Sequence, residues 1–433
     1  MTATLNRGLN ALREQIDSSV ASFFTSCVHC GLCAEACLFY LETEDPQYTP
    51  IKKLDLMRRM WSREFTLFGR IGGLIGLVKP VTDDDLKAWE TLVYDSCTMC
   101  GRCSMVCPVG NDITFMIRKM RECMSAAGHA PRELIGAAER HQEKGSPMGD
   151  LRHALHAHVK HAIADTGVEV EFDKQGADYM VVLSAQEIAE FPEIITSLAR
   201  IFKAAGVTWT LSDHAFEATN VGVQLGNRDV ARMLVQRIVD AAEGLGVKYV
   251  ISPECGHAYQ ALRWEGPNLI GRPYNFGVVH IIELLDQLRA QGKLKTKGRD
   301  TTKGRDTTKV TFHDPCQINR RGGINREPRN LMNMIADNFI ETDEAGTMNW
   351  CCSGGGGVGA NERAADLKIK AFRRKKAQLD KVRPEKVVTM CAYCHHTLEE
   401  MLEEYDMDLE VQGLTDLVAE YLDDGAEAAP AQD

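Results

Sequence analysis

The 433-residue sequence predicts a helical N-terminal domain followed by two α/β domains that repeat one another, the first of them degenerate. Two cysteine runs in the first 147 residues are connected by segments with helical apolar spacing, such as 51–61 and 85–93. From about Ala177, short β-rich runs alternate with longer helical patterns, which is typical of βα units around a parallel sheet. Similar turns recur at matching places in the second half, which indicates an internal repeat.

Five segments follow from these patterns. We expect a helical domain over residues 1–147, a degenerate α/β domain over 148–292, a linker over 293–308, a second α/β domain over 309–425 and a disordered tail over 426–433. The linker contains a hexamer, 296–301, that is repeated at once as 302–307, a pattern typical of flexible, exposed chain. The histidine-rich stretch 139–161 is polar and irregularly spaced, so we expect one solvated helix there.

Composition and charge exclude several classes of protein. A hydrophobic content of 44% with 26% charged residues indicates a globular chain with two or three cores. The net charge of −11 argues against a nucleic-acid partner, because phosphate binding needs a basic surface. Residues 1–18 carry charges and no long apolar core follows, so we expect no secretory signal and a cytoplasmic protein.

The apolar stretch Ile71–Val78 is too short to span a membrane. We expect it to be a buried turn or packed helix, with a docking surface for a membrane subunit as the alternative.

Six strands are expected, in two sets of three. The first set covers 179–184, 207–212 and 248–253, and the second covers 310–314, 347–350 and 386–390. The turn 252–259, which contains Cys255 and His257, corresponds to the turn 390–396 after the last strand of the second set. The segment 212–222 corresponds to 351–359. The first copy therefore lacks most of the cysteines present in the second.

The two N-terminal cysteine runs have the spacing of bacterial ferredoxins. Cysteines in a chain without an export signal are more often metal ligands than disulfides. In the ferredoxin pattern, three closely spaced thiolates hold one [4Fe–4S] cubane and the fourth cysteine of each run reaches the other cluster. We therefore assign Cys27, Cys30, Cys33 and Cys107 to one cubane, and Cys97, Cys100, Cys103 and Cys37 to the other. Gly31 and Gly101 make the loops of the two cysteine runs flexible where backbone amides must approach the sulfides of a cluster. Zinc is the alternative, and two complete copies of the spacing favour iron–sulfur clusters.

A third set of cysteines follows the strands of the second α/β domain. It consists of Cys316, Cys351, Cys352, Cys391 and Cys394. The carboxyl ends of parallel strands meet at one edge of a sheet, which brings these thiols together. Five thiols exceed what a cubane or a zinc site uses, so we favour an unusual iron–sulfur cluster. A thioredoxin-like dithiol, a structural zinc site and a c-type haem, which needs export, are the alternatives.

Two cysteines stand apart from the three sets. Cys255 in the degenerate copy would point toward the third cluster if the two copies face each other, with His257 beside it for proton or thiol handling. Inert packing is the alternative for both residues. We expect Cys123, on a predicted helix, to be buried.

The cysteine motifs of this chain resemble those of a known protein family. Asp-Pro-Cys316, Trp-Cys351-Cys352-Ser-Gly-Gly-Gly-Gly and Cys391-x-x-Cys394, after a double ferredoxin run, resemble the CCG-domain proteins related to the catalytic subunits of heterodisulfide reductase. The resemblance implies one noncubane [4Fe–4S] cluster, held by the five cysteines of the third set, that works directly on disulfides. Because the first copy keeps only Cys255, no second such cluster is expected.

The sequence around the two N-terminal cysteine runs resembles the branch of this family that serves dissimilatory sulfur metabolism. That branch implies a haem-bearing membrane subunit that exchanges electrons with quinone, further complex subunits, and a small thiol carrier protein whose disulfide or trisulfide is the substrate. It also implies a peripheral position on the cytoplasmic side of the inner membrane. The alternatives are a subunit acting on a low-molecular-weight heterodisulfide, and a non-catalytic relay such as the iron–sulfur subunits of glycerol-3-phosphate or glycolate oxidation.

Overall fold

The computed structural model describes residues 3–297 and 308–423, and within them the chain forms two compact units. Unit 1 contains Met1–Glu143, Asn220–Leu234 and Trp350–Gln378, and unit 2 contains the rest of the chain. Each unit is therefore assembled from stretches that are far apart in the sequence. Most of the predicted linker and the whole predicted tail lie outside the described residues.

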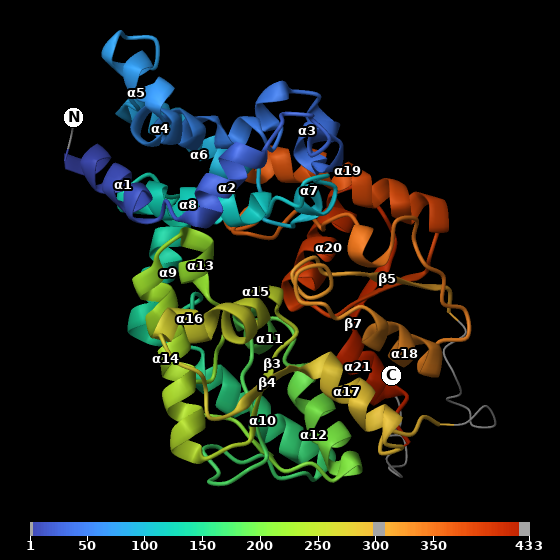
Figure 1. The fold of residues 1–433 in the computed structure, drawn as a ribbon. Helices are drawn as coiled ribbons and strands as arrows, with labels where there is room; N and C mark the ends of the chain where they lie inside the picture. Colours follow the sequence, from blue (N-terminus) through green and yellow to red (C-terminus); the bar gives the residue numbers. More distant parts are fainter. Residues whose placement is uncertain (1–2, 298–307, 424–433) are drawn as a thin grey trace. The chain divides into compact units, whose positions relative to one another are not determined.

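Unit 1 is helical (Figure 1). Its α-helices are α1 (Ala3–Glu14), α2 (Ser18–Ser26), α3 (Leu38–Thr43), α4 (Asp55–Phe65), α5 (Leu67–Leu74), α6 (Asp83–Glu90), α7 (Arg102–Met105), α8 (Ile113–Ala126), α9 (Arg132–Lys144), α13 (Val221–Leu225) and the first parts of α14 (Arg228–Leu245) and α19 (Ala365–Val382). Tighter turns are η1 (Ala34–Ala36), η2 (Pro46–Tyr48), η3 (Lys52–Leu54) and η7 (Glu362–Ala364), and η4 (Thr91–Asp95) is a π-helical turn.

The core of unit 1 forms around helix α8. Asp112 caps this helix by accepting a hydrogen bond from the Phe115 amide at 3.1 Å. Met116, Met120 and Met124 then recur at helical spacing and are fully buried, and α1 packs against this face. Cys123, on the same helix, is 1% exposed, which confirms the predicted burial.

Unit 2 contains two parallel sheets, as the alternating pattern predicts. The first has the order β2-β1-β3-β4 and the second the order β5-β6-β7. The strands are β1 (Tyr179–Val181), β2 (Trp209–Thr210), β3 (Tyr249–Ser252), β4 (Gly277–His280), β5 (Val310–His313), β6 (Lys386–Thr389) and β7 (Glu410–Gly413). The helices are α10 (Arg152–Thr166), α11 (Ala185–Ala189), α12 (Glu193–Ala205), α15 (Gly256–Tyr259), α16 (Gly266–Ile270), α17 (Ile281–Ala290), α18 (Arg326–Ile335), α20 (Ala392–Glu404) and α21 (Leu414–Glu420), with the turns η5 (Gln260–Glu265) and η6 (Gly346–Met348).

Five of the six predicted strands are confirmed, and the strand predicted over 347–350 is wrong. That segment begins as the turn η6, because Gly346 adopts a φ of +67° that ends extended structure. The Gly346 amide and the Asn349 side chain both bond to Asp314, at 2.7 and 2.6 Å, instead of joining a sheet. Strands β4 and β7 were not predicted.

Two expectations about helices are also wrong. The single solvated helix expected over 139–161 is interrupted, because α9 ends at Lys144 and Gly145 adopts a φ of +94° before α10 begins. His141, at the end of α9, is 1% exposed. The stretch 71–78 was expected to be buried, whereas Leu74 in α5 is 88% exposed. Among the described residues, no helix is long and apolar enough to cross a membrane.

Candidate metal centres

Four of the predicted ligands line one cavity in unit 1. Cys27 directly follows α2, and Cys30, Cys33 and Cys107 face the same cavity. Gly31 adopts a φ of +84°, which lets the loop turn sharply between the cysteines. Burial raises the pKa of the Cys33 thiol to about 11, and the neighbouring sulfurs of Cys27 and Cys30 add to the rise. The Cys33 thiol therefore keeps its proton unless a cation is bound beside it, and a bound metal deprotonates its cysteine ligands.

The other four predicted cubane ligands line a second cavity in unit 1. Cys37, Cys97, Cys100 and Cys103 surround it. Burial raises the pKa of Cys103 well above its usual range, the other three sulfurs raise it further, and Lys53 opposes the rise. The Lys53 ammonium is 2% exposed and lies 3.7 Å from the Cys37 sulfur, so this cavity has a buried positive charge beside it.

These two groups of four sulfurs fit tetranuclear iron–sulfur clusters in number and in chemistry. Thiolate sulfur is the soft ligand that such clusters use, and each cavity combines three closely spaced cysteines with a distant fourth. The assignment of individual cysteines to clusters stays a prediction.

Within unit 1, the loop that contains Cys351 and Cys352 contacts the loop that carries Cys97, Cys100 and Cys103 of the second cavity. The Cys351 thiol donates to the Thr98 hydroxyl at 3.5 Å, and Thr98 immediately follows Cys97. Arg102 lies over the Trp350 ring, with its guanidinium carbon 3.4 Å from the ring centroid. Gly356 has a φ of +65°, and a Cβ there would lie 2.7 Å from the Thr98 carbonyl carbon. The glycines after the paired cysteines therefore permit a close backbone approach, as their sequence indicates.

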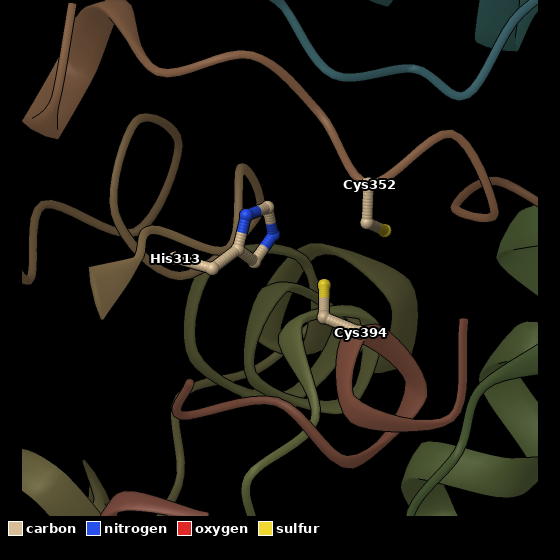
Figure 2. Close-up of side chains that lie close together, drawn as sticks. All are labelled: His313, Cys352 and Cys394. Atoms are coloured by element: carbon tan, nitrogen blue, oxygen red, sulfur yellow. The ribbon is translucent and has the colours of Figure 1, made fainter. Parts of the chain in front are cut away.

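The remaining cysteines of the third set belong to unit 2. Cys391 precedes α20, and Cys394 lies in its first turn. A ring nitrogen of His313, at the end of β5, lies within 4.8 Å of the Cys394 sulfur, and Figure 2 shows both side chains pointing into the same space. Cys352, also labelled in Figure 2, belongs to unit 1. A hydrogen bond from Cys394 lowers the pKa of Cys391, and the amides of Gly256, Cys394 and Tyr393 contribute to the shift.

Cys316 is held by a network around Asp314. The Asp314 carboxylate, which is fully buried, accepts hydrogen bonds from the Asn319 side chain at 2.7 Å and from Arg329 Nη2 at 2.7 Å. Two residues later, Cys316 begins a loop in which Gln317 packs against Gly256: a Cβ on Gly256 would lie 2.5 Å from the Gln317 Cβ. The Cys316 loop is therefore pressed against the turn that carries Cys255.

Cys255 lies close to Cys391 within unit 2. It precedes α15 as Cys391 precedes α20, and the Ala392 amide donates to the Glu254 carbonyl at 2.7 Å. Burial raises the pKa of the Cys255 thiol, and the Cys391 sulfur adds to the rise. His257 is half-buried at the start of α15. The roles of both residues remain predictions.

Three residues near the cysteines were missed as candidates from the sequence. His313 had one available signal, its place at the end of a predicted strand just before Asp-Pro-Cys316. Thr98 and Lys53 had none, because their contacts join segments separated by 253 and 16 residues.

Three carboxyl groups lie near one another around Glu254, the residue before Cys255: Glu187 and Glu254 are buried, and Asp416 is half-buried. Glu254 accepts hydrogen bonds from the Thr415 amide and hydroxyl, and Glu187 accepts one from the Glu254 amide at 3.0 Å. Burial raises the pKa of Glu187 to about 7 and that of Asp416 to about 7. The Ser197 hydroxyl, which donates to Asp416 at 2.6 Å, opposes the second shift.

Asp416→Asn is expected to make the free energy of unfolding less dependent on pH. With its folded pKa above its unfolded value, Asp416 binds more protons in the folded state, so wild-type stability falls as pH rises from about 4 to about 7 and stays lowered above that. Wild type should lose about 1 kcal/mol more than the variant between pH 6 and pH 8. Anaerobic urea unfolding at the two pH values measures this, with the exposed Asp84→Asn as control. Equal pH slopes for Asp416→Asn and wild type would contradict the assignment.

Two family models match separate parts of the chain, one in each half. Residues 24–111 match the 4Fe-4S dicluster domain family, and residues 310–399 match the CCG family, described as a cysteine-rich domain. The chain is 26% identical to the Hdr-like menaquinol oxidoreductase iron-sulfur subunit 2 of Archaeoglobus fulgidus, over 96% of this chain and 82% of the relative. It is also 26% identical to a subunit of the dihydromethanophenazine:CoB–CoM heterodisulfide reductase of Methanosarcina acetivorans, over 92% of this chain and 93% of the relative. The EtfAB:quinone oxidoreductase of Syntrophomonas wolfei is 26% identical over 85% of this chain and 54% of the relative.

The two cysteine-lined cavities and these matches together define an iron–sulfur electron-transfer protein. More particularly, these relatives are heterodisulfide-reductase-like and menaquinol oxidoreductase subunits, which supports an oxidoreductase role for this chain within a complex.

Proposed function

We propose that this chain exchanges electrons between a membrane quinone or haem partner and a protein disulfide or trisulfide, and that it resembles DsrK of the DsrMKJOP complex. Eight cysteines would hold two cubane [4Fe–4S] clusters, and Cys316, Cys351, Cys352, Cys391 and Cys394 would hold a noncubane one. The contact between Cys351 and Thr98 carries the proposal. Because Thr98 lies in the loop between Cys97 and Cys100, a ligand of the reacting cluster would adjoin the ligand loop of an electron carrier.

The connectivity of the chain supports the assignment of all five cysteines of the third set to the same cluster. Asn349 is tied to the Asp314 carbonyl at 2.6 Å, two residues before Cys316, and Cys351 follows Asn349 by two residues. The cysteine-rich family match, 310–399, also contains all five cysteines.

The reaction consumes two electrons and two protons: R–S–S–R′ + 2 e⁻ + 2 H⁺ gives R–SH and R′–SH. When bound, the clusters supply one-electron carriers, which suits a donor such as a quinol that gives electrons singly. The chain's own residues favour the anionic sulfur at Cys391, because the amides of Gly256, Tyr393 and Cys394 are directed at it. Burial of all five cysteines keeps water away from the reacting sulfur.

The expected partners are a DsrM-like haem-bearing membrane subunit and a DsrC-like thiol carrier, on the cytoplasmic side of the inner membrane. The Archaeoglobus relative is named a menaquinol oxidoreductase subunit, which supports quinol as the electron source. The Methanosarcina relative is named for the CoB–CoM heterodisulfide, so an HdrD-like small-molecule disulfide is the second candidate.

Electron paramagnetic resonance with iron and sulfide counting tests the proposal. Anaerobically purified protein should contain about twelve irons per chain, four for each cluster. Adding the disulfide form of a DsrC-like carrier should produce a new signal in the oxidised state, and the reduced carrier is the control. About eight irons, with only reduced-cubane signals and no response to the carrier, would leave an electron relay of the flavin-dehydrogenase type instead.

A further inference from the structure

Helix α5 and the turn after it expose a concentration of large apolar side chains. The segment 65–80, here called the α5 tip, belongs to unit 1 and follows α4 (Figure 1). Phe68 is 85% exposed, Leu74 88% and Leu77 78%. The exposed large hydrophobic residues of the tip are Phe65, Leu67, Phe68, Ile71, Leu74, Ile75 and Leu77. Isolated exposed apolar residues are normal, whereas a continuous group of this kind marks an interaction surface.

The tip is held in place by its own contacts, so its exposure does not come from fraying. The Thr66 hydroxyl caps α5 by accepting from the Gly69 amide at 3.0 Å. Arg63 donates to the Val78 carbonyl, and Arg70 donates to the Glu64 carbonyl at 2.8 Å. Gly69 is buried against α4, where a Cβ would overlap the Ser62 carbonyl. The glycine side of α5 therefore faces inward and its large apolar side chains face outward.

The outward side chains form one stripe along the helix. At 100° per residue, Leu67, Phe68, Ile71 and Leu74 fall within about 120° of one another, with Ile75 continuing the stripe. Arg70 lies beside the stripe, and both Arg70 and Lys79 are exposed. No aspartate or glutamate occurs between residues 65 and 82, although the whole chain carries a charge of −11. Glu64, the nearest acid before the tip, pairs with Arg13 at 2.6 Å.

We propose that the α5 tip inserts its apolar stripe into the surface of an anionic lipid bilayer. An amphipathic helix with Phe and Leu on one side and Arg or Lys at its border lies in the headgroup region with its apolar side in the acyl boundary. Arg70 and Lys79, in a segment without aspartate or glutamate, match anionic headgroups. This surface is independent of the cysteine chemistry.

Co-sedimentation with vesicles tests the proposal on the full cluster-loaded chain. Wild type should bind vesicles of equal parts phosphatidylglycerol and phosphatidylcholine, and bind phosphatidylcholine vesicles at least tenfold more weakly. Phe68→Glu combined with Leu74→Glu should reduce binding at least tenfold, because it removes the two most exposed apolar groups. Arg70→Gln combined with Lys79→Gln should remove the preference for the anionic vesicles. Met233→Glu, at an exposed apolar residue on α14, is the matched control and should bind as wild type does.

Three results would overturn the proposal. One is equal binding by wild type and Phe68→Glu/Leu74→Glu. Another is the absence of binding to either vesicle. The third is a dimer of wild type, in light scattering without lipid, that Phe68→Glu/Leu74→Glu dissociates, which would assign the stripe to a second copy of the chain. Unchanged cluster absorbance in each variant shows that the fold is intact, so loss of vesicle binding is separable from loss of disulfide chemistry.

Discussion

Arg121→Met is expected to destabilise unit 1 by at least about 3 kcal/mol, because it leaves several buried carbonyl groups without a donor. Arg121 is fully buried on α8 and lies over the Tyr94 ring. It donates to the carbonyls of Val93 at 2.9 Å, Cys97 at 2.8 Å and Gln224 at 2.8 Å, and also to that of Gly356. One guanidinium thus joins the three stretches of sequence that make up unit 1.

The measurement is the midpoint of anaerobic urea unfolding, followed by cluster absorbance and circular dichroism. Because the Cys97 carbonyl is one of the four acceptors, we expect the clusters of the Met variant to be lost at lower urea than the secondary structure. Arg121→Lys keeps the charge but cannot reach four carbonyls, so it should be intermediate. Arg7→Met, on the exposed side of α1, is the control. An Arg121→Met midpoint equal to that of Arg7→Met would refute this role.

The same residue explains why part of the fold could not be predicted. Three of the four ligands of each cubane lie close together in the sequence, at a spacing that the size of the cluster restricts. The two N-terminal sets were therefore recognisable from the sequence. Strands β1, β3, β5 and β6 were recognisable because β-branched and aromatic residues together dominate them. By contrast, nothing local places 220–234 and 350–378 in the helical unit, since this depends on Arg121 and its distant acceptors.

The errors at single elements have similar causes. The apolar stretch 71–78 was expected to be a buried turn or packed helix, whereas Gly69 packs α5 onto α4 and the large apolar side chains of the stretch lie outside. The extended pattern of 347–350 was overridden by the hydrogen bonds that Asp314 accepts. His313 was not among the candidates, because its proximity to Cys394 appears only when β5 and α20 are brought together.

Cys394→Ser is expected to remove the third cluster and abolish disulfide reduction while both cubane sets remain. The serine oxygen is a poor ligand for the iron of such a cluster, which uses the soft thiolate that Cys394 would supply. Iron should fall from about twelve to about eight atoms per chain, and the carrier-dependent resonance signal should disappear. The reduced-cubane signals should persist, because Cys394 lines neither cavity of unit 1.

Cys255→Ser and Cys123→Ser make this experiment decisive. Cys123 is buried in the core of unit 1 and outside all three sets, so its replacement should leave iron content and activity unchanged. Cys255 lies beside Cys391 but was not assigned as a ligand, so we expect its variant to keep about twelve irons. A lowered rate with full iron would place Cys255 in thiol handling, whereas a loss of about four irons would make it a ligand. If Cys394→Ser kept all its iron and its rate, the cluster assigned to the third set would be refuted, and with it the proposal that this subunit acts on sulfur.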